Sequence, residues 1–157
     1  MDGIKFVLNS KEVCYTGSAA DRLLDVLRDT YDMKSVKCGC KEGECGACAV
    51  LLDGVLVNSC CVAAGAVEGS EITTVEGFRE TEQFKVLSNA FAGLSAVQCG
   101  FCIPGMVMAA QALLSANPHP TDDEIREGLS GNLCRCTGYN AIVNAVKNAA
   151  KEGEGLW

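Results

Sequence analysis

The stretch Gly39-Cys40-Lys41-Glu42-Gly43-Glu44-Cys45-Gly46-Ala47-Cys48 decides the fold of this 157-residue chain. Its three cysteines have the spacing C-x4-C-x2-C, and a fourth, Cys60, follows at the end of the next predicted hairpin. This spacing is a ligand pattern of [2Fe-2S] clusters held by four thiolates. The interspersed glycines allow the backbone to approach a compact anionic cluster and to adopt positive φ angles. We therefore predict that Cys40, Cys45, Cys48 and Cys60 bind a [2Fe-2S] cluster.

Zinc and a shifted ligand register are the alternatives for this first cysteine group. A four-cysteine zinc site commonly uses two C-x2-C pairs, and only Cys45 and Cys48 form such a pair here. Cys38 allows a C-x6-C reading up to Cys45, but the x4 spacing favours Cys40 as the first ligand.

A second group of four cysteines lies in the C-terminal half of the chain. Cys99 and Cys102 form a C-x2-C pair, and Cys134 and Cys136 form a C-x-C pair. Each pair borders a predicted helix, and the dipole at a helix N-terminus favours thiolates and an anionic core. The spacing favours iron–sulfur for this second group, with zinc as the open alternative.

The residues on either side of the first group predict a small sheet with one helix. Short apolar runs indicate strands, and an apolar stripe indicates an amphipathic helix. Ser18-x-x-Asp21 resembles a capping box, and Asp53-Gly54 fits a two-residue hairpin turn. The predicted elements are strands over 4–8 and 12–15, a helix over 19–29, a ligand loop over 36–48, and strands over 49–52 and 55–59.

Helical periodicity replaces the strand patterns beyond about Gly77, so we place a domain boundary there, between residues 1–76 and 77–157. Thr121-Asp122-Asp123-Glu124 is a second possible capping box, and Pro104 stands where a helix could begin. The apolar stripes lie within 84–91, 107–114, 125–129 and 141–149. The second half is therefore predicted to be all-helical.

Composition restricts the class of protein and its partners. Hydrophobic residues make up 48% of the chain and charged residues 21%, which is typical of a globular protein. A formal charge of −7 argues against nucleic acid or an anionic membrane as a partner, because both require a basic surface. The sequence shows neither an export signal nor a long apolar run, so we expect a cytoplasmic protein. Eleven cysteines, odd in number and tightly grouped, disfavour disulfides in a reducing compartment.

Four motifs together resemble a known family. They are Gly39-Cys40-x4-Cys45-Gly46-Ala47-Cys48, Ser59-Cys60, Gln98-Cys99-Gly100-Phe101-Cys102-x-Pro104-Gly105 and Gly131-Asn132-Leu133-Cys134-Arg135-Cys136-Thr137-Gly138-Tyr139. In this order they resemble the small iron–sulfur subunit of the molybdenum hydroxylases. That family includes xanthine dehydrogenase, aldehyde oxidoreductase, carbon monoxide dehydrogenase and nicotinate dehydrogenase.

The resemblance implies an α+β fold and a non-catalytic role in electron transfer. It implies a plant-ferredoxin-like β-grasp domain over 1–76 and an all-α four-helix-bundle domain over 77–157, each with one [2Fe-2S] cluster. It further implies a large partner subunit with molybdopterin, as the cytosine dinucleotide, and a medium subunit with FAD. Electrons would pass from the molybdopterin centre through the two clusters to FAD. By the same resemblance, Gln98 and Cys136 contact the molybdopterin.

Several alternatives to this assignment stay open. The chain could be a free-standing two-cluster ferredoxin, a zinc-stabilised interaction module, or the small subunit of a carbon monoxide or aldehyde dehydrogenase. For a molybdenum hydroxylase we expect an N-heterocyclic substrate such as nicotinate or a purine. Three cysteines lie outside the ligand sets. We expect Cys14 and Cys61 to be small buried hydrophobic residues and Cys38 to be a free thiol near the first cluster.

Overall fold

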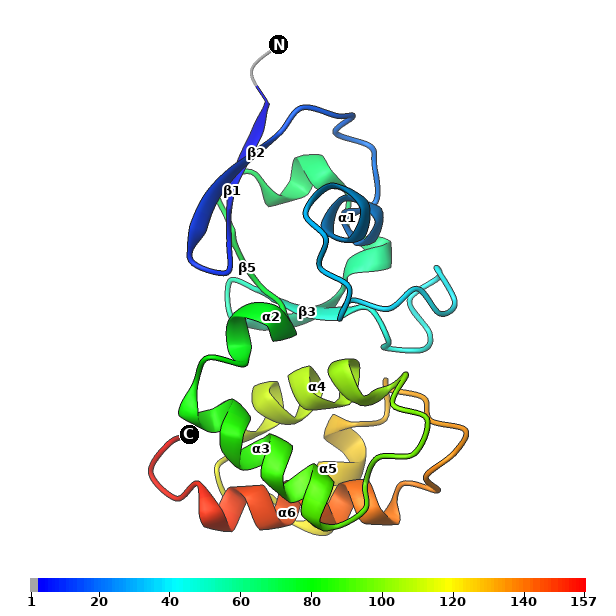
Figure 1. Cartoon of the computed structure of the whole chain (residues 1–157), viewed down its shortest axis with the longest axis vertical. Coiled ribbons are helices and arrows are strands. Elements are labelled where there is room, and N and C mark those ends of the chain that lie inside the picture. Colours follow the sequence, from blue (N-terminus) through cyan, green and yellow to red (C-terminus); the bar gives the residue numbers. More distant parts are fainter. Residues whose placement is uncertain (1–2) are drawn as a thin grey trace.

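Five strands form one mixed sheet in the N-terminal part of the chain, as the computed structural model of residues 3–157 shows (Figure 1). The strands are β1 (Ile4–Leu8), β2 (Lys11–Tyr15), β3 (Ala49–Leu52), β4 (Val55–Asn58) and β5 (Glu71–Thr73). Their order in the sheet is β2-β1-β5-β3-β4. Only β1 and β5 pair in parallel, and the other neighbours are antiparallel. The four predicted strands are thus confirmed, except that the second begins at Lys11 and the last ends at Asn58.

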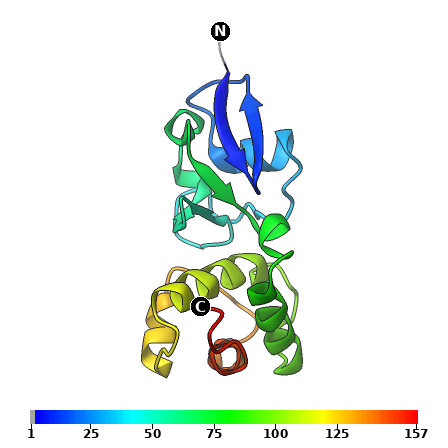
Figure 2. The same ribbon diagram turned by 90° about the vertical axis from the view of Figure 1, so that its left-hand side faces the viewer.

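The C-terminal part is helical and packs below the sheet region as a separate layer (Figures 1 and 2). Its helices are α2 (Val75–Phe78), α3 (Glu82–Gly93), α4 (Ile103–Ala116), α5 (Asp122–Gly128) and α6 (Asn140–Glu152), whereas the short α1 (Leu23–Asp25) lies beside the sheet. The predicted α+β class is confirmed. No helix within the described residues is both long and apolar enough to span a membrane.

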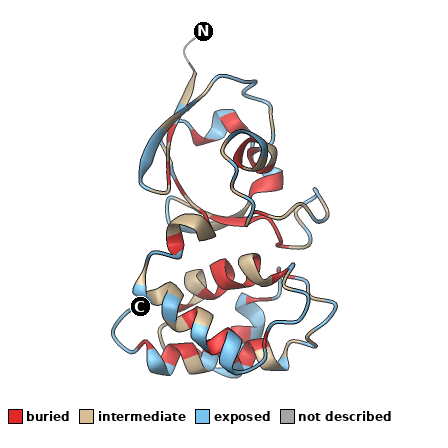
Figure 3. Ribbon diagram, in the orientation of Figure 1, coloured by how far each residue is buried: buried red, intermediate tan, exposed pale blue. Residues whose placement is uncertain are grey.

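Strand β3 belongs to the hydrophobic cores of both layers. Side chains alternate between the two faces of a strand. Val50 and Leu52 pack into the core of the sheet region, whereas Ala49 and Leu51 pack against the core formed by the helices. Helix α4 lies against this strand, and half of its residues are buried (Figure 3). The first cysteine group immediately precedes β3, so its loop is anchored where the two cores meet.

The helix predicted over 19–29 is shorter than expected. Regular helix begins only at Leu23 in α1 and continues as a π-helix over Val26–Thr30. Ser18 and Asp21 form a local turn in which the Ser18 amide donates to the Asp21 carboxylate at 2.9 Å. At the start of α1 the backbone instead hydrogen-bonds to a neighbouring segment, because the Leu23 amide donates to the Val62 carbonyl. The predicted capping box at Ser18 is therefore wrong, whereas the one at Thr121 is confirmed at the start of α5.

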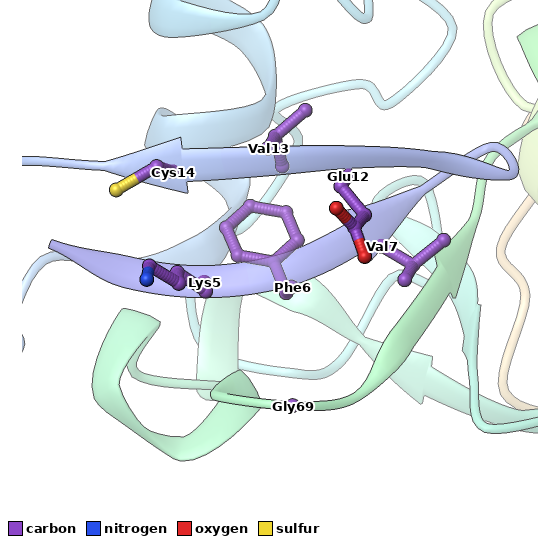
Figure 4. Close-up of a pocket in the computed structure, with 7 residues that line it drawn as sticks. All are labelled: Lys5, Phe6, Val7, Glu12, Val13, Cys14 and Gly69. Carbon is purple, nitrogen blue, oxygen red and sulfur yellow. The ribbon is translucent and has the colours of Figure 1, made fainter.

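The expectation that Cys14 and Cys61 are buried is wrong, because both side chains are exposed. Cys14 lies on β2, which is an edge strand, and its side chain points to the face opposite Val13 and Tyr15. Figure 4 shows Cys14 beside its strand partner Lys5, in an open pocket that Phe6 and Val13 also line. Cys61 follows Cys60 in a short 3₁₀ turn, and its sulfur lies 3.7 Å from that of the buried Cys60.

A carboxylate in α2 joins the sheet region to the start of the first cysteine loop. Glu76 accepts hydrogen bonds from the amide of Ser35 at 2.8 Å and from the hydroxyls of Ser35 at 2.5 Å and Thr74 at 2.7 Å. Thr74 is fully buried, and its amide donates to the Asn9 side chain at 2.9 Å. Burial raises the pKa of the Glu76 carboxyl, but the donors from Ser35 and Thr74 outweigh it and lower the pKa overall.

Replacement of Glu76 by Gln should destabilise the protein by about 1 kcal/mol at neutral pH, since it removes charge-assisted hydrogen bonds. A carboxyl whose folded-state pKa is lowered contributes stability above its unfolded-state value of 4.5, and this contribution is lost as the pH falls below that value. The difference between wild type and Glu76→Gln in urea midpoint, followed by circular dichroism, should therefore be smaller at pH 4 than at pH 7. Glu80→Gln, in an exposed ion pair with Arg79, is the matched control and should change little. An equal effect of the two substitutions would contradict this role for Glu76.

Candidate metal centres

The first cysteine group is assembled by a loop and a hairpin. Cys40, Cys45 and Cys48 lie in the loop before β3, and the β3–β4 hairpin returns the chain so that Cys60 follows β4 directly. The amide and the hydroxyl of Ser59 both donate to the Cys48 carbonyl, at 3.3 and 2.8 Å. This contact holds Cys60 beside the loop. The four predicted ligands thus approach in two pairs, Cys40 with Cys45 and Cys48 with Cys60, whose side chains interact.

Backbone amides stabilise a thiolate in the first group. The amides of Glu42 and Glu44 point at the Cys40 sulfur, at 3.4 and 3.3 Å. Gly43 between them has a φ of +83°, which glycine adopts without strain. The Glu42 amide is the main cause that lowers the pKa of Cys40 to about 7. Burial instead raises the pKa of Cys48 to about 11, so that thiol requires the charge of a bound metal to ionise.

Cys38 occupies a different environment from Cys40. Its side chain is partly buried and packs against the apolar core of the sheet region. The amides of the loop are directed at Cys40 instead. The geometry therefore supports Cys40 as the first ligand.

The second cysteine group lines an open cavity of about 610 Å³ at one end of the helical region. Cys102 immediately precedes α4, and Cys99 lies three residues earlier, while Cys134 and Cys136 lie in the loop between α5 and α6. The sulfurs of Cys99 and Cys136 are 3.7 Å apart, and the side chains of Cys102 and Cys134 also interact. The structure thus brings together all four cysteines of the second predicted ligand set. Cys102 stands at the N-cap of α4, where the helix dipole favours negative charge.

Two side chains that the sequence analysis did not single out hold Cys134 in place. The hydroxyl of Thr137 donates to the Cys134 sulfur at 3.1 Å, and the Cys134 amide donates to the Tyr139 hydroxyl at 2.8 Å. Burial raises the pKa of Cys134, but the donors from Thr137 outweigh it and lower the pKa to about 7. In contrast, burial raises the pKa of Cys102 to about 12.

Hydrogen bonds between backbone segments link the two cysteine groups. The amide of Leu133 donates to the Cys45 carbonyl at 3.0 Å, and the side-chain amide of the buried Asn132 donates to the Gly46 carbonyl at 3.1 Å. Gly105 of α4 packs against the same Gly46 carbonyl, and a Cβ atom at position 105 would lie only 2.3 Å from its oxygen. The two ligand loops also lie on the same side of the molecule (Figure 1).

The donor sets fit [2Fe-2S] clusters. The cysteines of each group approach in pairs, and a [2Fe-2S] core has two irons, each of which takes two of the four protein ligands. The amide and hydroxyl donors at Cys40 and Cys134 favour the thiolate form that ligates iron. Residues Cys40, Cys45, Cys48 and Cys60 would hold one cluster, and Cys99, Cys102, Cys134 and Cys136 the other.

The predicted molybdopterin contacts, Gln98 and Cys136, lie at the open side of the second group. Both side chains are exposed, and Gln98 directly precedes Cys99, whose sulfur approaches that of Cys136. Two large apolar side chains close to them, Phe101 and Leu133, are also exposed, by 48% and 57%.

Comparison with known proteins identifies the class and then the family. Residues 74–147 match the family model of a [2Fe-2S] binding domain, so the chain is an iron–sulfur protein. It is 52% identical over 130 residues to the nicotinate dehydrogenase small FeS subunit of Eubacterium barkeri, with 83% of each chain covered. It is 49% identical over 132 residues to the xanthine dehydrogenase iron-sulfur-binding subunit of Escherichia coli O157:H7, with 82% of each chain covered. A chain of quinoline 2-oxidoreductase from Pseudomonas putida 86 superposes with a TM-score of 0.90 at 39% identity, covering 97% of this chain and 95% of that one.

The chain belongs to the small iron–sulfur subunits of the molybdenum hydroxylases. It is therefore a component of an oxidoreductase complex, as the cysteine motifs predicted. The relatives are small subunits of multi-subunit dehydrogenases, which implies larger partner subunits.

The contact between Gly105 and Gly46 can be tested with two alanine substitutions in helices. Gly105→Ala should destabilise the protein by about 1–3 kcal/mol, because the added methyl group meets a backbone carbonyl that cannot move away cheaply. Gly93→Ala, at the end of α3, has open space around the new methyl group and should be neutral or stabilising by up to about 1 kcal/mol. Urea unfolding of the two variants measures the difference. Equal stability of the two would show that the close approach is unimportant.

Proposed function

We propose that this chain relays electrons within a molybdenum hydroxylase, from a molybdopterin centre through two [2Fe-2S] clusters to FAD on another subunit. A [2Fe-2S] cluster accepts and releases one electron at a time. The observation that supports the relay most directly is the hydrogen bond between the Leu133 amide and the Cys45 carbonyl. Leu133 adjoins Cys134, so a single hydrogen bond connects the backbones of the two ligand groups. The eight cysteines named above are the proposed ligands.

The proposed domain organisation follows the two layers of the fold. In this proposal residues 1–76 form a β-grasp domain of the plant-ferredoxin type and residues 77–157 form a four-helix-bundle domain. The two separate hydrophobic cores support this division. Because β3 contributes to both cores, the two proposed domains would keep a constant relative position, and with it a constant separation of the two ligand groups.

The face around the second group is proposed to dock the large subunit that carries molybdopterin cytosine dinucleotide. Phe101 and Leu133 are apolar and about half exposed beside the cysteine cavity, and Arg135 adds a cation that suits a phosphorylated cofactor. Gln98 and Cys136 would contact the cofactor itself. The loop of the first group, with Cys40, would face the FAD subunit.

The substrate proposed for the complex is an N-heterocycle such as nicotinate or a purine. Relatives named for nicotinate, xanthine and quinoline support this choice, since all three are nitrogen heterocycles. The substrate site would lie on the large subunit. Assays of the purified complex with nicotinate, hypoxanthine, carbon monoxide and an aldehyde test the proposal. Activity with carbon monoxide or the aldehyde, and with neither heterocycle, would contradict it.

The cluster content of the purified protein tests the ligand assignment. We expect about four irons and four acid-labile sulfides per chain, with two distinct EPR signals after reduction. Cys40→Ser should lose one signal, whereas the matched Cys38→Ser should keep both, because the loop amides are directed at Cys40. A colourless protein with stoichiometric zinc, or loss of a signal in Cys38→Ser only, would contradict the assignment.

Native purification distinguishes the relay subunit from a free-standing ferredoxin. The chain should copurify with two larger subunits, together with molybdenum and flavin. A monomer that exchanges electrons with several soluble proteins and binds no larger subunit would instead identify a ferredoxin.

A further inference from the structure

The sulfur of Cys134 receives two hydrogen bonds from one residue. The Thr137 hydroxyl approaches it at 3.1 Å and the Thr137 amide at 3.5 Å. The hydroxyl contact is within the usual range for a donor to sulfur, so it is the stronger of the two. Thr137 thus supplies both a side-chain donor and a backbone donor to the sulfur of a proposed ligand.

The loop around Thr137 is held in the conformation that this contact requires. The Tyr139 hydroxyl accepts the Cys134 amide at 2.8 Å, and the Tyr139 amide donates to the Thr137 hydroxyl oxygen at 3.4 Å. The latter contact occupies a lone pair of the hydroxyl and leaves its proton free for the sulfur. Tyr139 has a φ of +69°, an unfavourable conformation for a bulky residue that the surrounding contacts maintain. The hydroxyl is therefore preorganised towards the sulfur.

Cys40 and Cys134 differ in the origin of their closest donors. In the first group, backbone amides of Glu42 and Glu44 donate to Cys40, and these donors persist whatever side chains are present. In the second group the shorter contact comes from a side chain, which a single substitution can remove. The hydrogen bonding at the Cys134 sulfur thus depends on which residue stands at position 137.

We propose that Thr137 is a positioning residue that raises the reduction potential of the second cluster by donating a hydrogen bond to the Cys134 sulfur. This inference rests on the proposed function, in which Cys134 ligates that cluster. Reduction adds one electron and one negative charge to the cluster, and the ligand sulfurs carry part of that charge. A hydrogen-bond donor stabilises the more negative state more strongly, which shifts the equilibrium towards reduction. The hydroxyl therefore favours electron uptake by the second cluster.

Thr137→Val removes the hydroxyl and keeps the shape, so it should lower the midpoint potential of the second cluster. We expect the one-electron equilibrium to shift by up to about tenfold, equivalent to about 59 mV. Thr137→Ser retains the hydroxyl and should keep the potential close to that of the wild type. The first cluster is an internal control, because its potential should not move in either variant. The measurement is an EPR-monitored redox titration of the purified native complex.

An unchanged second potential in Thr137→Val, with both signals present, would overturn the inference while leaving the proposed function intact. Wild-type protein with a single cluster would instead contradict the proposed function itself. If Thr137→Val fails to assemble the second cluster, Thr137→Ser decides: retention of that signal at the wild-type potential supports the hydroxyl, and its loss overturns the inference. A second measurement applies to the wild type alone. Exchange into D2O should reveal deuterons coupled to the reduced second cluster, and Thr137→Val should lose the coupling of the hydroxyl deuteron, while that of the amide at position 137 remains, wherever its cluster assembles.

Discussion

The close approach of three backbone segments at Gly46 is the constraint on which the rest of the structure depends. The Gly46 carbonyl meets Gly105 of α4 and the side chain of Asn132, which is 86 residues away in the sequence. Gly46 itself has a φ of +67°, and a Cβ there would lie 2.5 Å from the Gly131 carbonyl oxygen. Side chains at positions 46 and 105 would therefore separate the two cysteine loops. Glycine at both positions keeps the loops in direct backbone contact.

This constraint explains why the two loops can differ so much in construction. The first is a glycine-rich loop whose own amides surround a thiol, and the second is a pair of helix junctions completed by Thr137 and Tyr139. Both provide one thiol with a lowered pKa, Cys40 and Cys134. Both also contain a thiol whose pKa burial raises, Cys48 and Cys102. Two loops of different construction thus each contain one thiol with a lowered pKa and one thiol with a raised pKa.

The elements that could be predicted from the sequence are those specified by local chemistry. The Thr121 capping box and the Asp53-Gly54 hairpin follow from hydrogen bonds and turn preferences within a few residues. The short strand β5 and helix α2 were missed, because three or four residues carry too little pattern. The Ser18-x-x-Asp21 pattern was misleading, since the Asp21 carboxylate is engaged by Tyr15 as well as by Ser18.

The candidate site shows the same limit of local information. Cysteine spacing alone predicted the first ligand set, whereas the second was predicted with the help of the family resemblance, and the structure gathers the eight cysteines in two groups. The contact between Gly46 and Gly105 is tertiary and leaves no local pattern. Exposure of Cys14 depends on which face of an edge strand meets the core, which alternation alone does not reveal.

The two faces of β3 have a further consequence during synthesis, when the N-terminal region leaves the ribosome first. Until α4 emerges, the neighbouring side chains of Leu51 and Leu56 lack the helical core that covers them in the folded protein, so the nascent chain carries an uncovered hydrophobic surface.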